Sequence, residues 1–199
     1  GDDCVVERVR EYLRIRYDKP GRVFVGLVHR LDRNVSGVLL LARTSKAASR
    51  LSRAFAERRV DKRYLAVVCG HPAAAEELVD TLGPREGTRG VCRDLDGKEA
   101  RMRYERLVVA PGHALLRVEL MTGRKHQIRA QLALAGYPIL GDPLYGQALR
   151  SLRRPALHAQ RLGLEHPVRR VPLALTSPVP DALVRVAESL GLGTDLDQF

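Results

Sequence analysis

Apolar residues recur at helical spacing in four segments of the chain, and each segment predicts a helix. The first runs from Cys4 to Arg16, with Asp3 as its N-cap. The second begins at Thr44 or Ser45 and continues through an apolar stripe that ends near residue 55. The third covers residues 125–135, begins near Thr122 or Gly123 and ends at Gly136. The last helix is capped by Asp181.

Short apolar or alternating runs between these helices predict strands. They cover residues 38–42, 64–69, 102–109, 115–121, 156–162 and 171–176. Residues 71–98 contain Pro, several Gly and mixed charge, so we expect a long and mobile surface excursion there; residues 138–146 are rich in turns. The pattern predicts one α+β domain over residues 1–199, with a sheet as its core.

Charge changes this picture, because the chain is strongly basic. Lys and Arg number 34 against 23 Asp and Glu, which leaves a formal net charge of +11. Such a field suits a polyanion, and nucleic acid is the first candidate. The alternative is an Arg-rich composition that only keeps the surface soluble, and charge alone does not decide between the two.

Several classes of protein are disfavoured by the sequence. No apolar stretch approaches the ~20 residues that cross a bilayer, and the first residues lack the order of a signal peptide. Cys4, Cys69 and Cys92 are odd in number and far apart, so we expect no disulfide scaffold or zinc site, and we expect a cytoplasmic location. His29, His126 and His158 fall on different elements and form no recognisable metal-ligand set.

The polar segment of residues 29–37 lies just before an apolar run, on a loop at the edge of the predicted sheet. Asp32 stands between Arg30 and Arg33, and neighbouring cations hold a carboxylate in its ionised form. An ionised carboxylate serves as a nucleophile or as a base. The alternative is a surface ion pair or turn residue, with Ser36-Gly37 forming a tight turn.

Residues 122–129 are the second informative segment. Lys125 and Arg129 share a face of the predicted helix at i,i+4, and Arg129 follows the apolar Ile128, which predicts a half-buried cation. A buried cation needs a carboxylate partner, and Asp32 is the one we expect. Alternatively, Arg124 and Lys125 bind phosphate together with backbone N–H groups at the start of the helix. Both interpretations can hold for different residues.

Five collinear stretches then resemble one known family. They are His29-Arg30-Leu31-Asp32 with Ser36-Gly37, Lys62-Arg63-Tyr64-Leu65-Ala66-Val67, Gly97-Lys98-Glu99-Ala100 with Tyr104 and Leu107, Gly123-Arg124-Lys125-His126-Gln127-Ile128-Arg129, and Pro138-Ile139-Leu140-Gly141-Asp142 with Tyr145-Gly146. Leu157-His158-Ala159 and His166-Pro167 extend the likeness. From about Val28 to Pro178 the chain resembles the RluA-type pseudouridine synthases, enzymes that convert uridine in structured RNA to pseudouridine.

The resemblance implies a role for each matching residue. Asp32 is the expected catalytic aspartate, attacking the ribose at C1′ or removing its C2′ proton. Tyr64 is expected to pack on the uracil and to help remove the C5 proton, unless it is an ordinary sheet tyrosine. Arg129 is expected to pair with Asp32. Arg30 is expected to enter the space left by a flipped uridine, or else to contact phosphate.

The resemblance also implies a central, mixed but mainly antiparallel sheet flanked by helices, with the three catalytic side chains converging in a basic cleft across it. Further cations are expected to contact RNA. The expected RNA contacts are Arg30, Lys62, Arg124 and Lys125. No cofactor or metal is implied. The expected partner is structured ribosomal or transfer RNA, and a monomer is favoured.

Two positions and the start of the chain depart from the family's pattern. Val35 stands where Thr is more frequent and Gln131 where His is, and we expect altered packing at both. The family's opening strand, its Lys-Pro-Ala-Gly-like turn and the small N-terminal RNA-binding module have no match, so we expect a shortened form with reduced RNA affinity. The competing functions are a non-catalytic RNA-binding protein that keeps the fold, and a metal-dependent nuclease, which needs clustered carboxylates.

Overall fold

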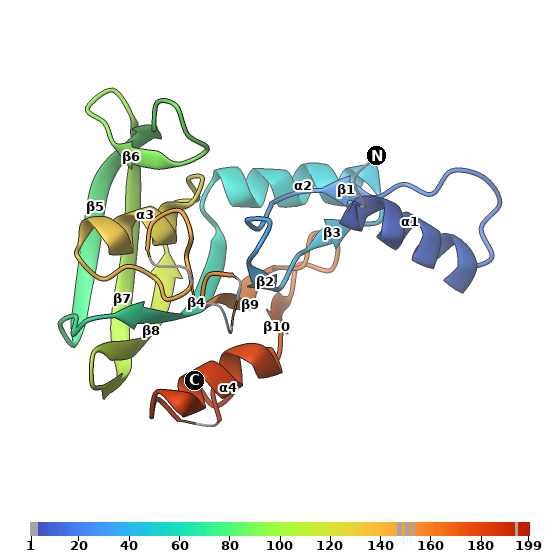
Figure 1. Cartoon of the computed structure of the whole chain (residues 1–199). Coiled ribbons are helices and arrows are strands. Elements are labelled where there is room, and N and C mark those ends of the chain that lie inside the picture. Colours follow the sequence, from blue (N-terminus) through green and yellow to red (C-terminus); the bar gives the residue numbers. More distant parts are fainter. Residues whose placement is uncertain (1–3, 147–148, 150–151, 153, 194) are drawn as a thin grey trace. The chain divides into compact units, whose positions relative to one another are not determined.

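The structure is a computed structural model that describes residues 4–146, 149, 152, 154–193 and 195–199. The elements follow one another as α1 (Val5–Arg16), β1 (Gly26–Leu27), β2 (Ser36–Gly37), β3 (Leu41–Ala42), α2 (Ser45–Ala56), β4 (Val60–Cys69), β5 (Ala75–Pro84), β6 (Val91–Arg93), β7 (Lys98–Ala110), β8 (His113–Leu120), α3 (Gln127–Leu134), β9 (Leu157–Glu165), β10 (Pro172–Thr176) and α4 (Asp181–Ser189) (Figure 1).

Two compact units make up the chain. Unit 1 comprises residues 1–30, 39–60 and 164–173, and unit 2 comprises residues 31–38, 61–163 and 174–199. The prediction of one domain over residues 1–199 stays a prediction.

Unit 1 is built from α1, α2 and the antiparallel pair β1–β3. Leu13, Val23 and Val25 form its buried centre. Thr44 caps α2 as predicted, because its side-chain oxygen accepts the N–H of Ala47 at 3.2 Å. The predicted cap of α1, Asp3, lies outside the described residues.

The apolar run of residues 38–42 does not form the single buried strand that was predicted. Its end, β3, pairs with β1, whereas the preceding β2 pairs with β9 and the N–H of Val38 donates to the carbonyl of Ala159 at 2.9 Å. The run is therefore divided between two sheets, and the residues between the two pairings are only half-buried.

Unit 2 contains most of a large sheet with the strand order β10-β9-β4-β8-β7-β5-β6. The pairs β4–β8, β8–β7, β7–β5 and β5–β6 are antiparallel, and β2 joins β9 in parallel. The predicted mixed, mainly antiparallel sheet is thus confirmed. Its centre is fully buried, with Leu65, Val68, Met102 and Leu116 all at 0% exposure.

The prediction of a surface excursion over residues 71–98 is wrong, because β5 and β6 extend the sheet there (Figure 1). β5 pairs with β7 from Ala75↔Glu105 to Leu82↔Lys98. β5 contains charged residues and Gly83, so its local sequence resembles a loop. That glycine is required, since a Cβ there would lie 1.9 Å from the Asp94 carboxylate.

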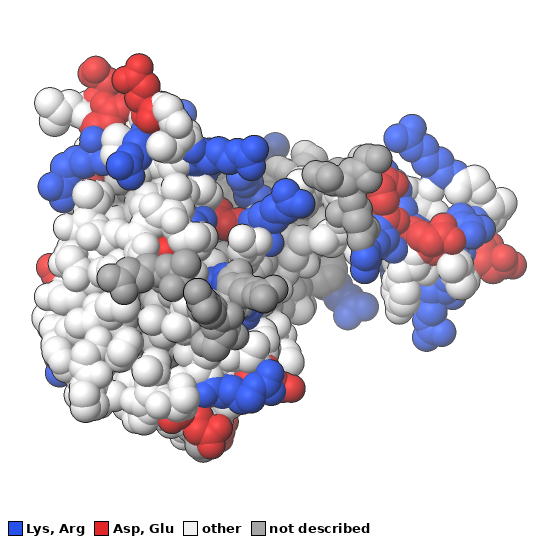
Figure 2. All heavy atoms as spheres, viewed as in Figure 1, with Lys and Arg blue, Asp and Glu red and all other residues white. Residues whose placement is uncertain are grey.

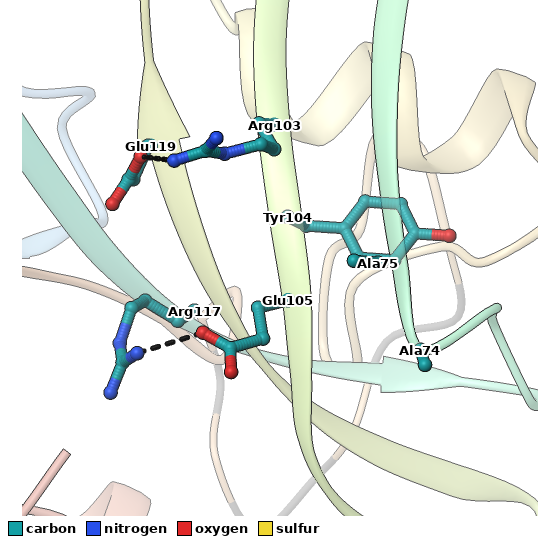
Figure 3. Close-up of a pocket in the computed structure, with 7 residues that line it drawn as sticks. All are labelled: Ala74, Ala75, Arg103, Tyr104, Glu105, Arg117 and Glu119. Atoms are coloured by element: carbon teal, nitrogen blue, oxygen red, sulfur yellow. Dashed lines mark hydrogen bonds and ion pairs between the residues drawn. The ribbon is translucent and has the colours of Figure 1, made fainter.

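One face of this sheet is charged. Along β7, Met102 and Tyr104 are buried, while Arg103 and Glu105 between and after them are exposed. Figure 3 shows the pairs that these exposed residues form with β8, namely Arg103–Glu119 at 2.6 Å and Arg117–Glu105 at 2.8 Å, around a shallow hollow. Alternating charges thus neutralise one another across the strands.

Both helices of unit 2 begin differently from the predictions. α3 starts at Gln127, because His126 before it adopts a left-handed conformation with φ of 50°. α4 starts at Asp181, with Pro180 at its N-cap; Asp181 therefore lies in the first turn instead of capping the helix. In the described part of the chain, every helix is too short or too polar to cross a bilayer.

Candidate active site

The loop that carries Asp32 is fixed by its attachment to β9. The backbone carbonyl of Asp32 accepts the N–H of Val35 at 2.9 Å, and β2 follows at once, pairing Ser36 with His158 and Gly37 with Ala159. Gly37 has a φ of 128°, and a Cβ there would lie 2.2 Å from the Ala159 carbonyl oxygen. Only glycine allows this close approach, so Ser36-Gly37 is a strand contact and not a tight turn.

A buried histidine forms a hydrogen bond with the same loop. His158 is fully buried; its Nδ1 lies 2.8 Å from Ser36 Oγ and its Nε2 lies 3.0 Å from the carbonyl oxygen of Ser177. Burial lowers the pKa of His158, which favours the neutral ring. Because a carbonyl only accepts, the proton belongs on Nε2 and the Ser36 hydroxyl donates to Nδ1. Arg154 in turn donates to Ser36 Oγ at 3.0 Å.

Arg129 joins Asp32 to a second carboxylate, that of Asp142. Its guanidinium donates to Asp142 through Nε at 2.6 Å and Nη2 at 2.8 Å, and to Asp32 through Nη1 at 3.3 Å. The predicted Asp32–Arg129 pair is therefore present, but the shorter, two-point contact is with Asp142. Asp142 is fully buried and also accepts the N–H of Leu144 at 2.9 Å.

The charges of this cluster support one another. Burial on its own raises the pKa of Asp142, but the hydrogen bonds from Arg129 and Leu144 outweigh it and hold that pKa below its usual value. Burial likewise opposes the charge of Arg129, and the two carboxylates raise its pKa. Arg129 and Asp142 thus remain ionised at neutral pH, and the buried cation is neutralised.

His126 and Tyr145 complete the surroundings of Asp32. His126 Nε2 lies 3.9 Å from Asp32 Oδ1, and its Nδ1 lies 3.1 Å from the hydroxyl of Tyr145. That hydroxyl accepts the N–H of Val91 at 2.7 Å, so its own proton is free to donate to Nδ1. Burial lowers the pKa of His126. A neutral ring with its proton on Nε2, facing Asp32, satisfies all these contacts.

Tyr64 stands on β4 near the Asp32 carboxylate. It pairs with Val118 of β8, which pairs with Tyr104 of β7. Burial raises the pKa of Tyr64 to about 12, and the negative charge of Asp32 adds to the rise. The phenol is therefore protonated at neutral pH, and its pKa responds to the charge of Asp32.

The four cations predicted to contact RNA have different surroundings. Arg30 is exposed and belongs to unit 1. Lys62 Nζ donates to the carbonyl of Thr122 at 3.1 Å, and Arg124 Nε donates to the carbonyl of Glu99 at 2.8 Å. Both side chains therefore bind backbone carbonyl groups. Lys125 is exposed, but it precedes α3, so the predicted helical face shared by Lys125 and Arg129 is wrong.

Three residues of the cluster had no predicted role: Asp142, Tyr145 and His126. All three belong to quoted motifs, and that is the only signal the sequence offered for them. Gln131, noted as a departure, is fully buried and donates to the carbonyl oxygens of Leu78 and Ala100 at 3.2 and 3.1 Å, which ties α3 to the sheet.

The cluster has the parts needed for chemistry by a carboxylate. Asp32 is partly accessible, with 18% of its side chain exposed, and it is held by a buried guanidinium. Such a group attacks an electrophilic carbon or accepts a proton. Among the described residues, His, Cys, Asp and Glu nowhere gather in a group of three that could hold a metal ion.

Comparison with known proteins identifies the family. Residues 2–134 match the family described as RNA pseudouridylate synthase. The ribosomal large subunit pseudouridine synthase D of Xanthomonas campestris pv. campestris is 38% identical over 182 residues, which cover 83% of this chain and 54% of the relative. The protein of the same name from Escherichia coli K12 is 32% identical over 179 residues, covering 82% and 55%. The chain spans about half the length of these curated relatives.

Solved structures agree with the fold. Human RNA pseudouridylate synthase domain containing 4 superposes with a TM-score of 0.82 at 23% identity, covering 98% of this chain and 86% of that one. The extent of the family match and the order of the sequence motifs lead to one conclusion: the chain belongs to the RNA pseudouridylate synthase family of the RluA type, a family of isomerases.

Proposed function

We propose that this chain isomerises uridine to pseudouridine in large-subunit ribosomal RNA, with Asp32 as the catalytic residue. The observation that carries the proposal is the partly accessible Asp32 held by the buried Arg129. Family membership supports the reaction, and the names of the relatives support ribosomal RNA in preference to transfer RNA. The proposal includes a cytoplasmic location and a single domain over residues 1–199.

The reaction breaks the bond between N1 of uracil and C1′ of ribose and forms a bond from C5 to C1′. Asp32 attacks C1′ or removes the C2′ proton, and in either case its negative charge is needed. Arg129 donates a hydrogen bond to the Asp32 carboxylate and orients it. Tyr64 packs on the uracil. Because its raised pKa keeps it a phenol at neutral pH, the C5 proton passes to water and not to Tyr64. The uridine must leave its stack to reach Asp32.

Loss of the C5 hydrogen gives a direct assay. A transcript of bacterial large-subunit ribosomal RNA carrying tritium at C5 of uridine releases tritium to water when the new bond forms. We expect the wild-type chain to release tritium and Asp32→Asn to release none. Asp61→Asn is the matched control, because Asp61 is an exposed aspartate in an ion pair with Arg63 at 3.4 Å, and we expect it to be active.

The outcomes separate the candidate functions. Equal RNA binding by wild type and Asp32→Asn, with activity lost only in Asp32→Asn, supports catalysis by Asp32. RNA binding without tritium release from any variant identifies a non-catalytic RNA-binding protein and refutes the proposal. Tritium release from a transfer RNA transcript alone corrects the substrate.

A further inference from the structure

Most of the excess positive charge belongs to unit 1. Its 62 residues contain fifteen Lys and Arg against seven Asp and Glu, a net charge of +8, whereas the 137 residues of unit 2 contain nineteen against sixteen, a net charge of +3. The Asp32 cluster belongs to unit 2. The more basic unit is therefore not the one that carries the candidate catalytic residues.

Within unit 1, two of the four arginines of α1 pair with its two glutamates. Arg10 pairs with Glu7, and Arg14 pairs with Glu11 at 2.7 Å, each on the same side of the helix. Figure 2 shows the result, with basic and acidic side chains interleaved over α1 at the right of the picture. Such a surface attracts polyanions weakly.

The second helix of the unit, α2, is different. It contains Lys46, Arg50 and Arg53 and no acidic residue. These three residues lie at i, i+4 and i+7, which is one stripe along the helix. Lys46 also lies in the first turn, where the helix dipole disfavours a cation. Like charges in one stripe and a cation at the wrong end both weaken the helix, so folding alone does not explain them.

A turn next to α2 adds to the stripe. Arg50 donates through Nη1 to the carbonyl of Pro167 at 2.7 Å, which places Pro167, two residues before Arg169, against this side of the helix. Lys46, Arg53 and Arg169 are all exposed, and within the described part of the chain none of their side chains forms a hydrogen bond or ion pair. The exposed Ser49 lies between the cations of the stripe.

We infer that Lys46, Ser49, Arg50, Arg53 and Arg169, the α2 surface, dock the phosphate backbone of RNA. Exposed Arg and Lys with a hydroxyl among them provide the donors that phosphate oxygens accept, and they read no base sequence. The inference rests on the proposed function for the identity of the RNA, but it concerns binding and not the reaction. It assigns docking to unit 1 and chemistry to unit 2.

The test compares two triple variants of the full chain. Lys46→Gln, Arg53→Gln and Arg169→Gln together remove three cations of the α2 surface. The matched control, Arg10→Gln, Arg14→Gln and Arg59→Gln, removes three cations of the same unit that are paired with Glu7, Glu11 and Glu57. The probe is a labelled transcript of bacterial large-subunit ribosomal RNA, followed by fluorescence anisotropy from 0.05 to 0.3 M salt.

We expect the first variant to bind RNA about tenfold or more weakly near 0.1 M salt. The slope of log affinity against log salt should decrease in magnitude by about 2, since each lost phosphate contact contributes ~0.7–0.9. The control should lose less than about threefold and keep its slope. Unchanged binding by the first variant, or an equal loss in the control, overturns the inference. So does tighter binding of the wild type to anionic phosphatidylglycerol vesicles than to the transcript.

Tritium release separates this inference from the proposed function. With saturating RNA, the α2 variant should keep kcat and show a raised KM, because none of its changes touches the Asp32 cluster. A lowered kcat with unchanged KM overturns the docking role. If the wild type releases no tritium while the binding contrast holds, the proposed function fails and the docking surface stands.

Discussion

The two carboxylates that share Arg129 are expected to differ sharply in what they contribute to stability. Asp142 is fully buried and accepts two short hydrogen bonds from Arg129, whereas Asp32 accepts one at 3.3 Å and is 18% exposed. Breaking a buried ion pair costs about 3–5 kcal/mol, because the remaining charge loses its partner. Asp142→Asn retains one acceptor for Arg129 and keeps Asp32 near it, so we expect this variant to lower the free energy of unfolding by about 3 kcal/mol.

Asp32→Asn leaves the Arg129–Asp142 pair intact, and we expect a change in the free energy of unfolding within about 1 kcal/mol. Urea unfolding followed by circular dichroism at 222 nm measures both variants. With a slope of about 2 kcal/mol/M, Asp142→Asn lowers the midpoint by roughly 1.5 M. If the two variants unfold within about 1 kcal/mol of each other, the unequal division of Arg129 between its partners is refuted.

The same pair gives an acid dependence with a definite sign. The pKa of Asp142 is lower in the folded chain than in the unfolded one, so its contribution is fully present above the unfolded value of about 3.9. That contribution is lost as pH falls through the folded pKa. The stability difference between wild type and Asp142→Asn should therefore shrink below about pH 4, and a difference that instead grows on acidification contradicts the assignment.

Three further predictions concern other buried groups. Because the pKa of Tyr64 is raised to about 12, Tyr64→Phe should remove an ionisation above pH 11 from the absorbance titration at 295 nm, and Asp32→Asn should lower the pKa of Tyr64. If Tyr64→Phe instead removes a tyrosine that titrates near pH 10, the prediction fails. The pKa of His158 is lowered in the folded chain, so stability should fall as pH drops below the unfolded value of about 6.5, and His158→Gln should flatten that fall in urea titrations. Gln131→Leu, which leaves buried groups without partners, should cost ~1–3 kcal/mol by the same measurement, and an unchanged midpoint would show that its hydrogen bonds are dispensable.

The sequence pattern predicted the elements whose ends and buried sides are determined by nearby residues. α2 begins where Thr44 supplies a cap, and its buried side follows from Leu51 and Ala54. β5 was missed because its strand character depends on pairing with β7, a contact across about twenty residues that its own Gly83 and charged positions conceal. The start of α3 was misplaced because the left-handed His126 interrupts a sequence that is otherwise helical.

The candidate site was predictable to a similar extent. The Asp32–Arg129 pair followed from the burial expected beside Ile128 and from the family resemblance. Asp142 was not assigned to Arg129, because a turn-rich segment gives no periodicity from which its burial can be inferred. How far Tyr64 and Asp32 influence each other depends on the sheet register, which no single stretch of sequence contains.

Because Arg129 is held at two points by Asp142, its orientation does not depend on the state of Asp32. In the proposed reaction, Asp32 ceases to be an anion when it is esterified by ribose or takes up a proton, yet Arg129 would keep Asp142 as its counter-ion. The guanidinium would therefore keep its position through a complete turnover.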